Sequence, residues 1–157
     1  MSTLVLFDSN FGNTQKVAEA IAAELGNGAT ATPLAGLAKG ALEGVDLLVV
    51  GSPINAWKPT PRTQEFLDGL GADTLRGVHA AAFDTRVRLF IHGDAAGKIS
   101  HALGKAGARI VARPRGFIVE GREGPLAAGE VEGATAWARA IAVAARGAGP
   151  RAPGVTD

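Results

Sequence analysis

Small polar residues follow the first apolar run of the chain and could hold an anion. They are Ser9, Asn10, Phe11, Gly12, Asn13 and Thr14. They lead directly into a segment with helical periodicity, where free N–H groups and the helix dipole favour a phosphate or carboxylate. The same residue types also cap helices well, so their spacing alone leaves a capping role and an anion-binding role open. The segment contains no lysine, which excludes a P-loop.

A second candidate loop, residues 51–59, lies between a buried strand and a helix and contains Trp57. An exposed tryptophan there could stack on a flat ligand and add about 0.5–1.5 kcal/mol beyond the area it buries. The alternative is that Trp57 folds back onto the edge of the sheet as part of the core. A third loop, residues 84–93, contains Asp84, Thr85 and Arg86.

Strand-like and helix-like segments alternate along the chain and would position these loops. Apolar runs predict strands at 3–7, 29–34, 45–50, 78–83 and 109–119, the last broken near Pro114 and Gly116. Helical spacing or capping residues predict helices over 17–25, around 37–42, from Thr60-Pro61 to Gly71, from Asp94 to Gly107 and over 131–145.

This alternation predicts one α/β domain with a doubly wound parallel sheet and helices on both faces. In such a sheet, ligands bind beyond the carboxyl ends of the strands, where the three loops lie. We assign residues 1–146 to the domain and residues 147–157 to a flexible C-terminal tail.

Composition excludes several classes of site. The 157 residues include no cysteine, which removes disulfides, zinc thiolates, iron–sulfur ligation and a catalytic cysteine, and the histidines lack metal-ligand spacing. The net charge of +1 argues against nucleic acid, and the cluster of Arg109, Arg113 and Arg115 is expected to be a solvated strand edge. The apolar runs are too short for a membrane span or a signal peptide, so we expect a cytoplasmic protein.

The first loop with its flanking strand and helix, LVLFDSNFGNTQKVAEAIA, resembles the phosphate-binding loop of flavodoxins. The second loop, in VVGSPINAWKPTPRTQEFL, is similar to the family's loop over the flavin ring. The segments AAFDTRV and GPL…GE extend the resemblance to a group of short flavodoxin-like proteins, over about residues 3–146. The resemblance implies a flavodoxin-like, three-layer α/β/α fold whose five parallel strands have the order 2-1-3-4-5.

The resemblance also implies non-covalent FMN, with its phosphate at the first loop and its ring at the second and third loops. Main-chain groups at Ile54, Asn55 and Ala56 would reach the reactive nitrogen of the flavin. The implied cofactor-binding residues are Ser9, Asn10, Phe11, Gly12, Asn13, Thr14, Pro53, Ile54, Asn55, Ala56, Trp57, Asp84, Thr85 and Arg86.

The third loop departs from well-known flavodoxins, which usually place a tyrosine and acidic residues there. This chain has no tyrosine. An Arg86 near the ring would favour the negatively charged, reduced flavin by Coulomb attraction. The equally supported alternative is an Asp84–Arg86 pair that fixes the loop.

The implied function is electron transfer to a redox partner protein by a monomer or weak homodimer. The alternatives are an FMN-dependent NAD(P)H:quinone oxidoreductase and an interaction module that has lost flavin. A phosphate-accepting receiver domain is excluded because Gly51-Ser52 stands where its aspartate would be. We assign no catalytic residue, since His92 and Asp94 read as a loop residue and a helix cap, and no metal ligand.

Overall fold

The computed structural model describes residues 1–55, 57–88 and 93–147. The strands are β1 (Thr3–Phe7), β2 (Thr30–Pro33), β3 (Leu47–Asn55), β4 (Lys58–Pro59), β5 (His79–Val87), β6 (Arg109–Ile110) and β7 (Arg115–Val119). The helices are α1 (Asn13–Leu25), α2 (Pro61–Asp68), α3 (Ala95–Lys105) and α4 (Glu130–Gly147). Residues 148–157 of the expected tail lie outside the described residues.

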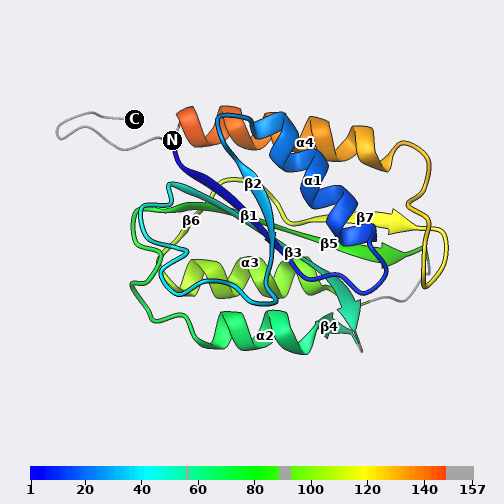
Figure 1. Cartoon of the computed structure of the whole chain (residues 1–157), viewed down its shortest axis with the longest axis horizontal. Helices are drawn as coiled ribbons and strands as arrows, with labels where there is room; N and C mark the ends of the chain where they lie inside the picture. The colour runs from blue at the N-terminus through cyan, green and yellow to red at the C-terminus, as the bar shows by residue number, and fades with distance from the viewer. Residues whose placement is uncertain (56, 89–92, 148–157) are drawn as a thin grey trace.

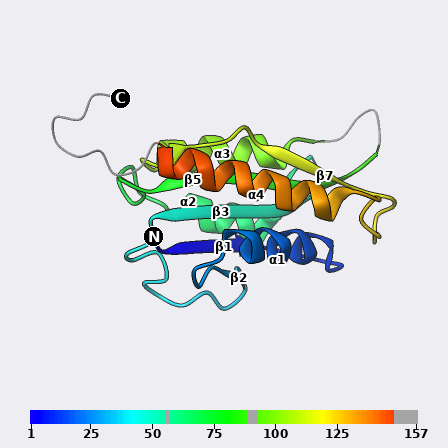
Figure 2. The same ribbon diagram turned by 90° about the horizontal axis from the view of Figure 1, so that it is seen from above.

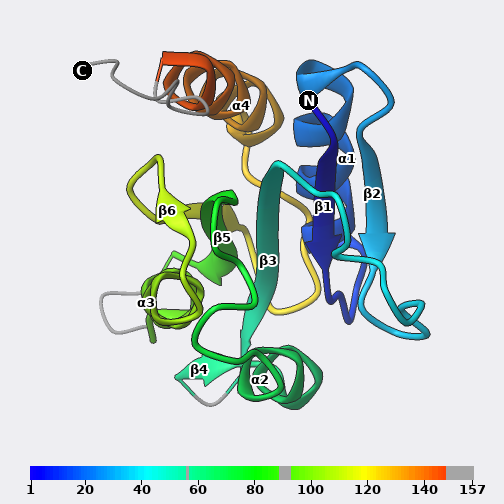
Figure 3. The same ribbon diagram turned by 90° about the vertical axis from the view of Figure 1, so that its left-hand side faces the viewer.

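The sheet has the predicted topology, with strands in the order β2-β1-β3-β5-β6 (Figure 3), and β7 also pairs with β5. Pairing between these strands is parallel, and the short β4 runs antiparallel to β3. Strands β6 and β7 share the fifth position, because β6 pairs with the start of β5 and β7 with its second half. The predicted order 2-1-3-4-5 and the predicted break in the last strand are therefore confirmed.

Helices cover both faces of the sheet, α1 and α4 on one and α2 and α3 on the other (Figure 1). Helices α1 and α4 lie side by side over the sheet (Figure 2), where Arg139 Nε is 3.2 Å from Glu24 Oε2. Alternate residues of β1, β3 and β5 point into one layer or the other, so each face has its own apolar core.

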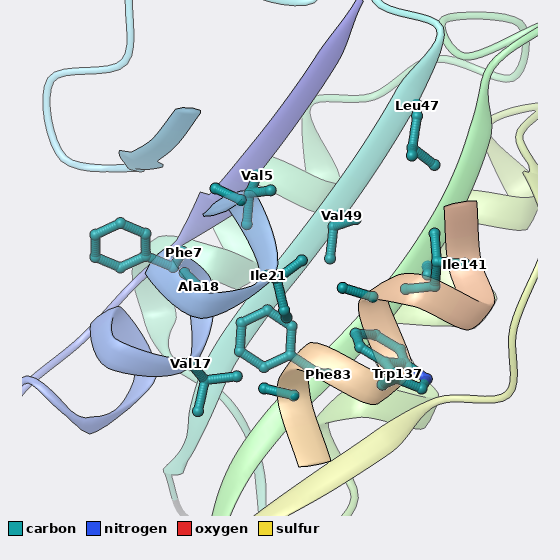
Figure 4. Close-up of a cluster of buried hydrophobic side chains, with 14 of the residues drawn as sticks. Val5, Phe7, Val17, Ala18, Ile21, Leu47, Val49, Phe83, Trp137 and Ile141 are labelled. Carbon is teal, nitrogen blue, oxygen red and sulfur yellow. The ribbon is translucent and has the colours of Figure 1, made fainter. Parts of the chain in front are cut away.

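The core under α1 and α4 is the one shown in Figure 4. Three aromatic rings from β5, β7 and α4 meet there edge to face, with centroids about 6 Å apart: Phe83, Phe117 and Trp137. The ring of Phe83 fills the space beside Gly51, where a Cβ atom would lie 2.0 Å from it. A glycine in the middle of β3 is therefore required by the packing.

Several helix boundaries follow the expected capping chemistry. Thr60 caps α2 with its side chain accepting from the N–H of Thr63, Pro61 takes the first helical position, and Asp94 caps α3. Helix α2 ends at Gly69 rather than at Gly71. In α4 the expected apolar stripe is buried except for Val131, which is 43% exposed. Trp137, which is not part of the predicted stripe, is buried as well.

The predicted helix around residues 37–42 is wrong, because this segment forms a series of turns. Gly36, Gly40 and Gly44 have φ values of 72°, 80° and 74°. This left-handed backbone conformation ends a right-handed helix before it can propagate.

Candidate functional site

A partly open cavity of about 290 Å³ lies at the carboxyl ends of β1, β3 and β5, beside the start of α1. It is the place where a doubly wound sheet binds its ligands. Its lining comes from segments far apart in the sequence: Ser9, Asn10, Phe11, Asn13, Thr14, Pro53, Ile54, Trp57, Thr85, Arg86, Val87, Gly93, Val119 and Arg122.

The first loop turns sharply at Gly12, which has a φ of 88° and is the N-cap of α1. The hydroxyl of Ser9 accepts from the N–H of Gly12 at 2.9 Å, which closes the loop. Among the described residues, no side chain accepts a hydrogen bond as the N-cap of α1, whose N-cap is Gly12. The N–H groups of the first turn therefore lack a side-chain cap in this part of the structure.

Two side chains of this loop are bonded to distant parts of the chain. The hydroxyls of Thr14 and Thr85 are 2.8 Å apart and buried, which ties the start of α1 to β5. The Asn13 amide donates to the main-chain oxygen of Glu123 at 3.1 Å. Gly124 gives this contact its room, because a Cβ there would lie 2.6 Å from Asn13 Oδ1. The loop is therefore held rigidly by its neighbours.

The second loop is a hairpin rather than an irregular segment. Strand β3 continues to Asn55 and pairs with β4 through Ile54 and Pro59. Trp57, at the turn, has a φ of 75° and is 57% exposed. The alternative that Trp57 belongs to the core is wrong, because the residue is exposed and lines the cavity. Gly93 lies against the main chain of Trp57, since a Cβ on it would be 2.2 Å from that residue's carbonyl oxygen.

The third loop holds the ion pair that the sequence left as one of two alternatives. Arg86 Nε lies 2.7 Å from Asp84 Oδ1, and its Nη2 lies 2.6 Å from Oδ2. Asp84 is fully buried, and its Oδ2 also accepts from the N–H of Ala96 at the start of α3. Hydrogen bonding to Asp84 raises the pKa of Arg86 above its ordinary value, although burial lowers it in part. Arg86 also lines the cavity, so it pairs with Asp84 and borders the space open to a ligand at the same time.

Most of the predicted site residues come together in this cavity, but three described ones are not part of its lining: Gly12, Asn55 and Asp84. Ala56 and His92 lie outside the described residues. Among the other histidines, His79 is buried in β5 and His101 is exposed on α3. Sequence reasoning missed four lining residues: Val87, Gly93, Val119 and Arg122. Extending the predicted strand 78–83 by four residues would have brought Val87 to the strand end beside the cavity. No local sequence pattern pointed to Arg122.

The charges around the cavity are unbalanced. Its described lining includes two arginines, Arg86 and Arg122, and no carboxylate. Within residues 1–55, 57–88 and 93–147, no group of three or more His, Cys, Asp or Glu side chains is arranged to hold a metal ion. Over the same ranges, no helix has the length and apolar character needed to cross a membrane.

Solved structures of known proteins share this fold. A flavodoxin from the domain Archaea superposes with a TM-score of 0.78 at 18% identity, over 93% of this chain and 99% of that one. Oxidised Flavodoxin 1 from Bacillus cereus gives a TM-score of 0.78 at 19% identity, over 90% and 97% of the two chains. The flavodoxin, WrbA-like protein from Agrobacterium tumefaciens gives 0.75 at 19% identity, over 93% and 98%. At these identities the likeness establishes the fold.

Sequence comparison with curated proteins finds no significant relative. The model of the flavodoxin domain, however, matches residues 4–88, which contain the first loop, the hairpin of Trp57 and the Asp84–Arg86 pair. This chain therefore belongs to the flavodoxin domain family.

Proposed function

We propose that this chain binds FMN non-covalently in the cavity at the start of α1 and carries electrons to a protein partner. The observation that supports this most is the convergence of three loops, from β1, β3 and β5, on one cavity. The cavity joins a polar helix start to two exposed aromatic rings, Phe11 at 47% and Trp57 at 57% exposure. FMN has the matching pair of ends, an anionic phosphate and a flat ring system.

The phosphate end fits the first loop. The N–H groups of the first turn of α1 have no intrahelical acceptor and no side-chain cap, so they are suited to an anion. The hydroxyl of Ser9 accepts from Gly12 and keeps its own hydrogen for a ligand. The Thr14–Thr85 bond would hold the helix start in place, which lowers the entropy cost of binding.

The ring end fits the second and third loops. Trp57 would stack on one face of the flavin, while Pro53, Ile54 and Thr85 line the cavity between the ring and the sheet. When bound, FMN would supply the capacity to accept and release electrons. The chain itself would contribute orientation, since Asp84 joins Arg86 at the end of β5 to the N–H of Ala96 at the start of α3.

The partner would differ from one that docks a strongly acidic flavodoxin. The whole chain has a net charge of +1, and the described cavity lining contains arginines but no carboxylate. Electrostatic complementarity favours a partner whose docking surface is neutral or acidic near its redox centre.

An FMN titration followed by flavin absorbance and fluorescence quenching tests the proposal. We expect saturable binding by the parent chain and weaker binding by Thr14→Ala and by Trp57→Ala, the latter by about tenfold. Val143→Ala, at an exposed position of α4 away from the cavity, is the matched control and should bind as the parent does. Unchanged affinity in both loop variants, or no binding by the parent, would contradict the assignment.

A kinetic measurement separates a carrier from an enzyme on the same fold. A carrier loaded with FMN should show no steady-state oxidation of NADPH with a quinone acceptor, while it exchanges electrons with a reduced partner protein. Sustained turnover would show that the chain is an oxidoreductase in its own right.

A further inference from the structure

The cavity contains one cationic side chain that is not engaged elsewhere in the described structure. Of its two arginines, Arg86 forms an ion pair with the buried Asp84, with hydrogen bonds of 2.7 and 2.6 Å. Arg122 is exposed, and no ion pair among the described residues involves it. Arg122 is therefore the cavity-lining arginine whose charge is not offset by a paired carboxylate among the described residues.

The turn that carries Arg122 is built firmly. The N–H of Glu120 donates to the oxygen of Pro125 at 2.8 Å, and the N–H of Gly124 to the oxygen of Gly121 at 3.0 Å. An isolated antiparallel bridge between Val119 and Leu126 closes its base. A tightly bonded turn presents its side chains with little loss of backbone entropy on binding.

The same turn is attached to the first loop. The residue after Arg122, Glu123, accepts at its main-chain oxygen from the Asn13 side chain, and Asn13 is the first residue of α1. The turn that carries Arg122 is therefore attached to the helix start, where the proposed function puts the phosphate, and Arg122 itself lines the cavity.

We infer that Arg122 makes the site selective for a flavin that carries a phosphate. This inference rests on the proposed function. A phosphomonoester carries about 1.5 to 2 negative charges at neutral pH, and a guanidinium can bind two of its oxygens at once. Riboflavin has the same ring system but no phosphate, so Arg122 would discriminate between the two flavins without affecting the recognition of the ring.

Titrations of the full chain with FMN and with riboflavin, at low and high salt, test this inference. We expect Arg122→Ala to weaken FMN binding by about fivefold to tenfold and riboflavin binding by less than about twofold. Arg122→Lys should lose part of the FMN affinity, because an ammonium keeps the charge but not the fork geometry. The FMN affinity of Arg122→Ala should also depend less on salt than that of the parent.

A matched control is Arg109→Ala, which removes an exposed arginine from β6, at the end of the sheet opposite the cavity. It should leave both affinities unchanged. The ratio of FMN to riboflavin affinity could stay unchanged in Arg122→Ala, because both affinities fall equally or because neither falls. Either result overturns the inference but does not contradict the proposed function. Failure of the parent chain to bind either flavin overturns the inference and the proposed function together.

Discussion

Two buried carboxylates, Asp8 after β1 and Asp84 within β5, hold the starts of helices on either side of the central strand β3. Asp8 follows β1 and accepts from the Thr60 hydroxyl at 2.6 Å and from Arg62 at 3.0 Å, which holds the start of α2. Asp84 lies in β5 and accepts from the N–H of Ala96, which holds the start of α3. Each carboxylate therefore fixes the helix that follows a cavity-forming loop.

The two sites differ in how their arginines meet solvent. The side chain of Arg62 is 56% exposed, whereas that of Arg86 is 17% exposed and pairs with a carboxylate that is fully buried. An exposed pair is screened by water and contributes little, but removing one partner of a buried pair leaves a charge without compensation. Removing the arginine from the Asp84–Arg86 pair should therefore lower the free energy of unfolding severalfold more than removing it from the Asp8–Arg62 pair.

The largest effect is expected from Arg86→Ala. The variant leaves the buried Asp84 with the Ala96 N–H as a remaining partner, and we expect the free energy of unfolding to fall by about 3 kcal/mol or more. Urea denaturation followed by circular dichroism measures the loss. A decrease below about 1 kcal/mol would show that water replaces the guanidinium, and would remove the contrast between the two sites.

Gly116→Ala disturbs the same pair without deleting either partner. A Cβ on Gly116 would lie 2.3 Å from Arg86 Nε, so the guanidinium would have to leave its position on Asp84. We expect the free energy of unfolding to fall by about 1–3 kcal/mol in urea denaturation. Gly104→Ala in α3 is the control, because its Cβ meets only Ile110 at 3.8 Å. The control should be neutral or slightly stabilising, and equal destabilisation of both variants would contradict the specific role of Arg86.

Thr60→Val tests the Asp8 site. It removes the hydroxyl that donates to Asp8 and that caps α2 by accepting from the Thr63 N–H. Loss of a buried hydrogen bond and of a helix cap should lower the free energy of unfolding by about 2 kcal/mol. Thr60→Ser keeps the hydroxyl and should restore most of this value; if it is as unstable as the valine variant, the methyl group rather than the hydrogen bond is what matters.

The smallest effect is expected from Arg62→Ala. Its guanidinium is more than half exposed, and Thr60 continues to donate to Asp8 when it is absent. The free energy of unfolding should change by less than about 1 kcal/mol in the same denaturation experiment. A loss as large as that of Arg86→Ala would mean that exposure does not distinguish the two carboxylates.

The fold was predictable because its information is local. Buried strands such as 3–7 carry continuous apolar runs, and the caps at Thr60 and Asp94 are recognisable residue by residue. The incorrect prediction of a helix at 37–42 shows the limit of apolar spacing as a signal. Gly36, Gly40 and Gly44, which lie within and beside this segment, have positive φ values that a helix does not allow. The spacing of apolar residues carries no information about where the backbone adopts a positive φ.

The cavity was predictable only in part because its contacts join distant segments. Motif resemblance indicated the first loop and the hairpin of Trp57, but the place of Arg122 depends on a contact between Asn13 and Glu123, 110 residues apart. The pairing of Asp8 with Thr60 and Arg62 likewise spans more than 50 residues. Such contacts follow from the packed sheet and are not visible in any local window of the sequence.

The bond between Asn13 and Glu123 also sets an order of events during synthesis. A ribosome releases the amino-terminal loop early, and β5 supplies its contact with Thr14 next, yet the contact with Glu123 becomes available only after β7 and the turn beyond it have emerged. Contacts of such long separation form late, because chain closure must come first. A nascent chain halted before residue 120 would thus lack the contact between Glu123 and Asn13, and the start of α1 would be held to the sheet by the Thr14–Thr85 bond instead.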